Sequence, residues 1–409
     1  MPHKLKRRGS NVFHRKRVPV KAIAWSVGAV LLVLFSYMGT KYILEDLPKK
    51  QEGSSSSTTS ATKPPATTST TSPADTSEPV TDPGKEIRGV YVLPKLFKEE
   101  AALDTTIAEA KKAGMNAFIF DLKNEQGRLL YQSATEIALD IKSAEENALP
   151  LDTLQSAVAK MKKQGIKPVA RLYAFQDPYA PQRLQTARIY TDGPGGATWH
   201  DDDPRKGGKA WLNPYKEDAH RYVIELIQEI QDAGIDTVML DGVQFPNKTY
   251  RAYFGNTKLS WSEILQQFIT KAQTSMGEGK LILSTPGLAA VGDGSTPFGG
   301  SPVILGESAI APKLMPSTLG KKLRFGDTEL VNPVSKPYEA VKITLEQIKL
   351  RISLMEEAKR PAVIPWIQAE DYTAAQLKEQ MRAVIEVMGD KAAYIVYHSD
   401  GSYPFGELD

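Results

Sequence analysis

Residues 219–241, AHRYVIELIQEIQDAGIDTVMLD, contain one complete helix-to-strand unit. Five apolar side chains recur at helical spacing and predict an amphipathic α-helix: Ala219, Tyr222, Val223, Leu226 and Ile230. Gly234 follows at the position where a glycine typically caps the C-terminus of a helix that leads into a strand. The apolar run Thr237–Leu240 then predicts a buried strand, and Asp241 is the first polar residue after it.

The same unit recurs along the chain. Eight apolar runs predict strands: Arg88–Leu93, Ala117–Leu122, Lys167–Phe175, Thr237–Leu240, Lys280–Ser284, Ser308–Pro312, Ala362–Trp366 and Ala393–Tyr397. Helical patterns lie between most of them, near 105–113, 151–161, 261–275, 338–357 and 373–388, whereas 286–307 is too rich in Gly and Pro to predict one. Alternating strands and helices indicate a parallel sheet, and eight units indicate an α/β protein with a (β/α)8 TIM barrel. A doubly wound open sheet is the alternative, but no glycine-rich phosphate loop follows the first strand.

The first 85 residues have a different composition from the barrel, which we place at 86–409. Residues 1–21 form a basic tail, and 22–40 are uncharged and mostly apolar, long enough for one transmembrane helix. The basic flank predicts a single-pass protein of the cell membrane, with a cytoplasmic N-terminus and an extracellular C-terminal domain. A cleaved signal peptide is the alternative, although no clear cleavage site follows the apolar run. Residues 41–85 are rich in Ser, Thr and Pro and predict a disordered stalk.

Composition excludes several classes of function. The net charge is only +3 and its excess lies in the basic tail, so we expect no nucleic-acid partner and a membrane contact through the N-terminal helix. The chain has no cysteine, which excludes disulfides, thiolate metal sites and cysteine nucleophiles. The run His200-Asp201-Asp202-Asp203 matches no zinc or calcium motif and predicts a solvated turn. We therefore expect neither a metal nor a cofactor.

Active sites of such barrels lie at the C-terminal ends of the strands, so the polar residues that follow each strand are candidates. Three carboxylates near strand ends are the candidate catalytic residues: Asp121, Asp241 and Glu370. Candidate substrate-binding residues are Arg171, Tyr173, Trp211, Asn213, Gln244, Lys313, Trp366, Gln368, Tyr397 and His398. Glycosidic cleavage needs one carboxyl group as acid and another as nucleophile or base, and aromatic faces can stack on sugar rings. A strand-end aspartate can instead cap the next helix, which is an alternative role for Asp121.

Several sequence blocks together resemble a bacterial family of glycoside-hydrolase-like TIM barrels, distantly similar to the α-amylases. The blocks are RGVYV (88–92), FIFDLKNEQGRLLY (118–131), IKPVARLYAFQDP (166–178), AWLNPY (210–215), GIDTVMLDGVQFP (234–246), APKLMPSTLG (311–320) and PWIQAEDY (365–372). The family's fourth-strand block reads like FDYVRFP, so Gln244 stands in place of an arginine that would hold the carboxylate ionised. The fifth-strand block offers Thr285 and no carboxylate, and the sixth lacks the family's aromatic residues. These departures concern catalysis and not the fold.

Three hypotheses follow. The first is a glycosidase that cleaves a cell-envelope or extracellular polysaccharide, with Asp241 as nucleophile or base, Glu370 as acid and Asp121 as a substrate-binding carboxylate. The second is a catalytically inactive barrel that binds glycans at the cell surface, which the missing fifth-strand carboxylate and Gln244 favour. The third is a structural envelope protein that binds protein partners, which a large exposed apolar patch away from the barrel mouth would indicate.

Overall fold

The computed structural model describes residues 87–255, 257–292, 297–306 and 308–408. The basic tail (1–21), the transmembrane helix (22–40) and the stalk (41–85) that the sequence predicts lie outside these residues. Among the helices that the structure does describe, none combines the length and the apolar character needed to span a bilayer.

Eight parallel strands close into a barrel, as the sequence predicts. In spatial order they are β1 (Arg88–Tyr91), β2 (Ala117–Lys123), β5 (Lys167–Tyr173), β7 (Thr237–Asp241), β9 (Lys280–Pro286), β10 (Ala309–Lys313), β14 (Trp366–Gln368) and β15 (Tyr394–Tyr397). The ring is closed because β1 pairs in parallel with both β2 and β15. A short strand, β13 (Ala362–Val363), pairs with β10 just before β14 begins and completes the seventh predicted strand.

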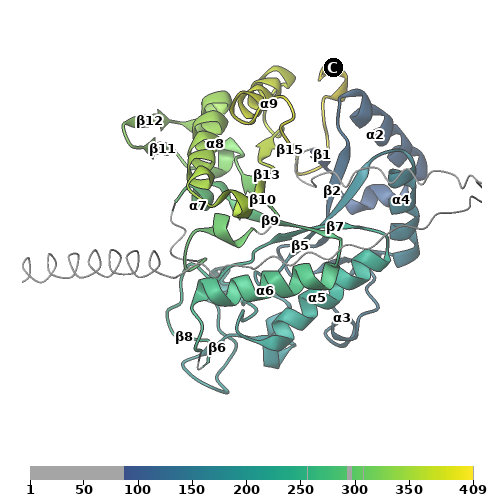
Figure 1. Ribbon diagram of the computed structural model, residues 1–409. Helices are drawn as coiled ribbons and strands as arrows, with labels where there is room; N and C mark the ends of the chain where they lie inside the picture. The colour runs from purple at the N-terminus through teal and green to yellow at the C-terminus, as the bar shows by residue number, and fades with distance from the viewer. Residues whose placement is uncertain (1–86, 256, 293–296, 307, 409) are drawn as a thin grey trace, which may run out of the picture. The chain divides into compact units, whose positions relative to one another are not determined.

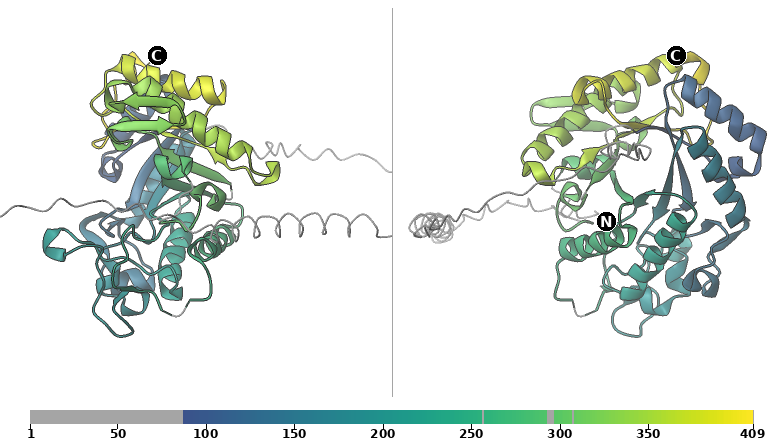
Figure 2. Two further views of the ribbon diagram at one scale, coloured as in Figure 1. Left: turned by 90° about the vertical axis from the view of Figure 1, so that its left-hand side faces the viewer. Right: turned by 45° about the vertical axis from the view of Figure 1, so that its right-hand side comes forward.

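Helices form an outer layer around the strands (Figures 1 and 2). They are α2 (Glu100–Lys112), α3 (Glu136–Asp140), α4 (Leu151–Lys163), α5 (Glu217–Asp232), α6 (Trp261–Met276), α7 (Gly287–Val291), α8 (Pro337–Ser353) and α9 (Ala374–Met388). The short α7 occupies the stretch after the fifth strand for which the sequence predicts no helix. Gly114, Gly165 and Gly234 have φ values of +74°, +76° and +91°, so each provides the left-handed residue that ends a helix before a strand.

The side chains of each barrel strand alternate between two cores. Ile119, Val169 and Met239 point into the barrel, where they pack with one another. Phe118 and Leu240, one position away, pack outward with the helices. Because strand side chains repeat every two residues, the next inward positions on each strand lie at the C-terminal mouth of the barrel. The same alternation that builds the interior therefore selects which side chains form the site.

Three pairs of short strands lie outside the barrel ring, and the sequence does not predict them. β3 (Leu129–Tyr131) pairs with β2, and β4 (Ala144–Leu149) extends the sheet beyond β3. β6 (Tyr190–Thr191) and β8 (Ala252–Tyr253) join the loop after β5 to the loop after β7. β11 (Lys322–Phe325) and β12 (Thr328–Val331) form an antiparallel pair after β10. All three pairs belong to loops that follow the C-terminal ends of barrel strands.

Candidate active site

Asp241 closes β7 and faces into the mouth of the barrel, two residues beyond the inward-facing Met239. It is only 4% exposed. Lys313 Nζ, from the end of β10, lies 2.6 Å from its Oδ2 atom. The Ser284 hydroxyl donates to the same oxygen over 3.1 Å, and the backbone N–H of Gly242 donates to Oδ1 over 2.9 Å. All three partners stabilise a negative charge on this carboxylate.

The charge state of Asp241 depends on two cations. Burial would raise the pKa of Asp241, but Lys313 and Arg171, whose Nη1 atom lies 3.8 Å from Oδ2, outweigh burial and lower the pKa. The carboxylate is therefore ionised at neutral pH. Gln244 stands where the family that the sequence resembles usually has an arginine, and the structure places cations from two other strands, β5 and β10, beside the carboxylate.

Asp121, which faces inward from β2, is held by Arg171 from the neighbouring strand. The guanidinium donates from Nε to Oδ1 and from Nη2 to Oδ2, the latter over 3.0 Å. The Tyr91 hydroxyl also donates to Oδ2, over 3.2 Å. Two-point contact with an arginine fixes the orientation of a carboxylate. Asp121 therefore fixes Arg171 in place, and the same guanidinium lies between Asp121 and Asp241.

Aromatic rings surround this guanidinium. The Arg171 Cζ atom lies 5.3 Å from the ring centroid of Tyr91, 5.4 Å from that of Tyr173 and 5.1 Å from that of Trp366. The Tyr397 ring completes the set, with its centroid 5.2 Å from Tyr91 and 6.0 Å from Trp366. Trp366 is fully buried, so its indole forms the floor of the site and not an open stacking face.

Two glutamates lie within electrostatic reach of the tyrosines at the mouth. Burial raises the pKa of Tyr397, and negative charges that include Glu370 and Glu125 raise it further. Glu125 also contributes to the raised pKa of Tyr173, which burial dominates. The Ser399 hydroxyl donates to Glu370 Oε1 over 2.6 Å. Glu370 is half-buried and Glu125 is exposed, so both carboxylates are accessible from solvent.

The remaining candidates from the sequence lie apart from this cluster. Trp211 is buried against Ile189 and Trp199, and its Nε1 donates to Asp201 over 3.0 Å. Asn213 is also buried, and its side-chain amide donates to the backbone carbonyl of Phe254 over 3.1 Å.

Three further candidates lie on the rim. Gln368 uses its amide on backbone atoms, donating to the Glu370 carbonyl over 3.0 Å and accepting from the Ser317 N–H over 3.1 Å. His398 is half-buried and its Nδ1 lies 2.7 Å from Asp400 Oδ1. Gln244 is half-buried. Of the sequence-predicted residues, the structure thus gathers Asp121, Arg171, Tyr173, Asp241, Lys313, Trp366 and Tyr397 into one cluster.

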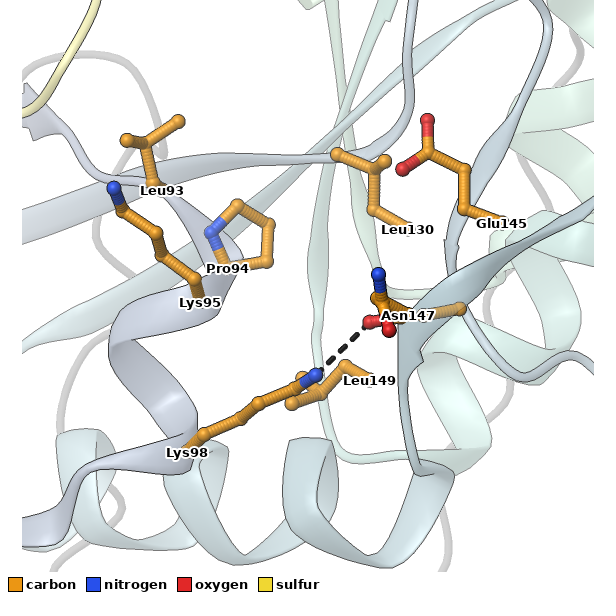
Figure 3. Close-up of a pocket in the computed structure, with 9 residues that line it drawn as sticks. Leu93, Pro94, Lys95, Lys98, Leu130, Glu145, Asn147 and Leu149 are labelled. Atoms are coloured by element: carbon orange, nitrogen blue, oxygen red, sulfur yellow. Dashed lines mark hydrogen bonds between the residues drawn. The ribbon is translucent and has the colours of Figure 1, made fainter.

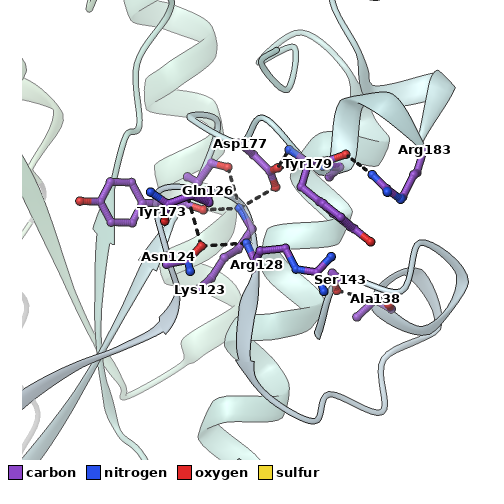
Figure 4. A network of polar contacts seen from close by, with 12 residues as sticks. Lys123, Asn124, Gln126, Arg128, Ala138, Ser143, Tyr173, Asp177, Tyr179 and Arg183 are labelled. Atoms are coloured by element: carbon purple, nitrogen blue, oxygen red, sulfur yellow. Dashed lines mark hydrogen bonds and ion pairs between the residues drawn. The ribbon is translucent and has the colours of Figure 1, made fainter. Parts of the chain in front are cut away.

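A separate buried ion pair supports the loop after β5 (Figure 4). Lys123 Nζ lies 2.8 Å from Asp177 Oδ2, and both side chains are fully buried. The ammonium also donates to the Tyr173 carbonyl over 2.6 Å. Asp177 Oδ1 accepts from the backbone N–H groups of Tyr179 and Ala180, each over 2.8 Å. This pair fixes the path of the chain just after Tyr173 and thus positions the wall of the mouth.

A groove of about 190 Å³ lies between the turn after β1 and strand β4 (Figure 3). Leu93, Pro94 and Leu149 contribute apolar surface, and Lys95 and Lys98 contribute cations. The Lys98 ammonium donates to the Asn147 carbonyl over 2.9 Å. Leu93 follows the C-terminal end of β1, so the groove lies on the mouth side of the barrel.

Tyr91, Ser284 and Glu125 also belong to the site, although the sequence pattern does not predict them. Tyr91 and Ser284 lie inside predicted strands, and counting inward positions in steps of two would have found both. Glu125 lies in the turn between β2 and β3, two residues before Gly127, whose φ is +75°. The sequence Asn-Glu-Gln-Gly predicts a turn, but the position of this turn depends on its pairing through β3, which the sequence does not predict.

Comparison with known proteins gives one family. A model of the family described as "Putative glycosyl hydrolase domain" matches residues 89–403. No curated protein matches the chain.

Among solved structures, the PgaB (BpsB) glycoside hydrolase domain from Bordetella bronchiseptica is similar, with a TM-score of 0.52, 15% identity, and coverage of 77% of this chain and 94% of that one. A hypothetical protein from Ruminiclostridium thermocellum has a TM-score of 0.42 and 21% identity, over 47% of this chain and 96% of that one. An α-galactosidase from Thermus thermophilus has a TM-score of 0.46 and 9% identity, over 79% of this chain and 62% of that one. The first of these likenesses supports the barrel fold.

Proposed function

Because the chain belongs to the family of putative glycosyl hydrolase domains, we propose that it is a glycoside hydrolase that cleaves a polysaccharide of the cell envelope or the extracellular space. One observation supports this proposal above all: a buried, ionised Asp241 at the mouth of the barrel, at the end of the fourth strand. Such an anion can attack or stabilise the positively charged sugar of the transition state.

Asp241 acts as nucleophile or base in this proposal, and Glu370 acts as the acid. Asp121 holds Arg171 in place, which in turn helps keep Asp241 ionised. Lys313 retains 21% of its side chain exposed, so an incoming sugar hydroxyl can replace its contact with Asp241. Glu125 is a further candidate for the acid, because it also lies within electrostatic reach of Tyr173.

The proposed location follows from the first 85 residues. We propose that residues 22–40 anchor the protein in the cell membrane and that residues 41–85 hold the barrel on the extracellular side. The polysaccharides of the envelope are then within reach of the mouth.

The decisive test is release of reducing ends from a panel of bacterial envelope and plant polysaccharides by the full-length chain. We expect Asp241→Asn to abolish release, because an amide can neither attack nor stabilise the cationic sugar. Asp236→Asn is the matched control: Asp236 precedes β7, and its side chain is 71% exposed in an ion pair with Lys162. Equal turnover by the Asp241→Asn variant and the wild type would refute the assignment.

A barrel that binds glycans without cleaving them is the second candidate. Among the described residues, every carboxyl whose pKa is displaced has its pKa lowered. A general acid usually needs a raised pKa, and none of these displaced carboxyl groups has one. Retention of a glycan without any release of reducing ends would favour this second candidate.

A further inference from the structure

The loops after β5 and β7 form a small structure of their own, which Figure 1 shows around β6 and β8 at the edge of the barrel. Two tryptophans and Ile189 form its core. Trp199 Nε1 donates to the backbone carbonyl of Tyr250 over 2.8 Å, which ties one loop to the other. Arg251 Nε donates to Asp192 Oδ1 over 2.8 Å and makes a second tie. The loop that carries Tyr250 is therefore held in place at Tyr250 and at Arg251.

A pocket of about 500 Å³ opens in this structure. Its volume falls within the roughly 300–1,000 Å³ typical of small-ligand sites. Its lining includes Thr198, Trp199, His200, Asp202, Lys248 and Tyr250. None of these residues belongs to the Asp241 cluster, so the pocket is separate from the mouth.

Tyr250 is unusual because its side chain is exposed although its backbone is held in place. It is 86% exposed, more than any other large apolar or aromatic residue that is exposed in the described part of the chain. Burying this aromatic surface against a ligand would be favourable, and the fixed backbone lowers the entropy lost on binding. The neighbouring hydroxyl, imidazole and carboxylate groups supply hydrogen-bond partners for a hydroxyl-rich ligand.

We propose that this pocket, with Tyr250 as its stacking face, binds a glycan strand outside the mouth of the barrel. The choice of a glycan as ligand rests on the proposed function, whereas binding at Tyr250 does not require Asp241. Such a site would hold a long polysaccharide while another part of it occupies the mouth. The substrate class is therefore a polymer and not a short oligosaccharide.

The charges around the pocket restrict the kind of glycan. Three aspartates, Asp201, Asp202 and Asp203, line it against two cations, Lys248 and Arg251. Arg251 pairs with Asp192, Lys248 with Asp202, and Asp203 with Arg205, so the charge left over in the lining is that of Asp201. The excess of negative charge disfavours uronic acids and other anionic sugars. The ligand is therefore a glycan without acidic groups.

The test measures retention of the full-length chain in native gels that contain hydroxyethyl cellulose, glycol chitosan or polygalacturonate. All variants carry Asp241→Asn, so that cleavage cannot alter the polymers. We expect retention by the neutral or the amino-bearing polymer and not by polygalacturonate. Tyr250→Ala should weaken this retention about five- to tenfold, which is the size of one lost aromatic contact.

Two controls separate stacking from folding. Tyr250→Phe keeps the aromatic face and should bind within about twofold of its parent. Leu354→Ala removes a side chain of similar exposure, 81%, from another part of the barrel and should bind unchanged. Retention that is equal in the Tyr250→Ala variant and its parent, or that occurs only on polygalacturonate, would overturn the proposal. Tyr250-dependent retention in a protein whose wild type releases no reducing ends would refute the proposed cleavage and leave this site standing.

Discussion

Replacing Lys313 with methionine tests the electrostatic account of the mouth. Methionine keeps an unbranched stem of similar length and removes the charge that lies 2.6 Å from Asp241 Oδ2. Removing one partner of a buried ion pair typically costs about 3–5 kcal/mol of unfolding free energy. Arg171 stays 3.8 Å from the carboxylate and Ser284 still donates to it, so we expect a loss near the lower end, about 3 kcal/mol.

The loss should depend on pH with a definite sign. In the wild type the folded pKa of Asp241 is lowered, so its contribution to stability is present above the unfolded pKa of about 3.9 and is lost as the pH falls through the folded value. Burial is the largest influence on this carboxyl and Lys313 is the largest that opposes it, so in the variant we expect the pKa of Asp241 to rise above the unfolded value. The variant then loses stability as the pH rises between the two values, so its deficit should be larger at pH 7 than at pH 4.

Urea denaturation of the full-length chain, followed by tryptophan fluorescence at both pH values, measures this deficit. The double variant Lys313→Met/Asp241→Asn provides the second arm, because an amide needs no counter-charge. We expect it to be more stable than Lys313→Met at pH 7. Two results would refute the conclusion that Lys313 stabilises the charge of Asp241. One is a Lys313→Met variant as stable as the wild type at both pH values, and the other is a double variant no more stable than Lys313→Met at pH 7.

Two further predictions concern packing. A Cβ atom on Gly127 would lie 2.0 Å from Asp177 Oδ1, whereas one on Gly114 would meet nothing within 4 Å, and both residues have φ near +75°. Gly127→Ala should therefore lower the unfolding free energy by about 1–3 kcal/mol more than Gly114→Ala in the same urea titration, and equal losses would show that the contact is easily relieved. Trp211→Phe should lower the unfolding free energy by about 1.5–3 kcal/mol, because the hydrogen bond to Asp201 is lost, and should leave KM for the polysaccharide unchanged. A raised KM with unchanged stability would instead show that Trp211 contacts the substrate.

The barrel could be predicted from the sequence because its elements are long and periodic. The helix that contains Tyr222 and Leu226 repeats its apolar face over several turns, and Gly234 marks its end. By contrast, β6 and β8 have two residues each and are stabilised by contacts between loops distant in sequence. Such short pairs carry no periodic signal, so pattern analysis does not detect them.

The predicted site residues differ in the same way: most of those placed by a barrel strand cluster at the mouth, and those placed by a long loop do not. Asp121, Asp241 and Lys313 can be predicted because they lie near the C-terminal ends of strands, and the position of a strand fixes the position of its end. Trp211 is a candidate because its aromatic face could stack on a sugar, and Asn213 belongs to the block AWLNPY (210–215) of the family resemblance, but no strand end places either residue. The structure uses both in the fold of the long loop instead.

Gln244 shows why charge at a site has to be counted in space and not along the chain. Within one sequence block, glutamine in place of arginine leaves Asp241 without a counter-ion. In the barrel, Arg171 and Lys313 reach it from strands on either side of β7, and Asp121 holds Arg171 from behind. Two carboxylates and two cations then balance in a buried mouth, where an unpaired charge would be costly. An arginine at position 244 would add a third cation, so its absence is consistent with an ionised Asp241 and does not by itself remove the proposed chemistry.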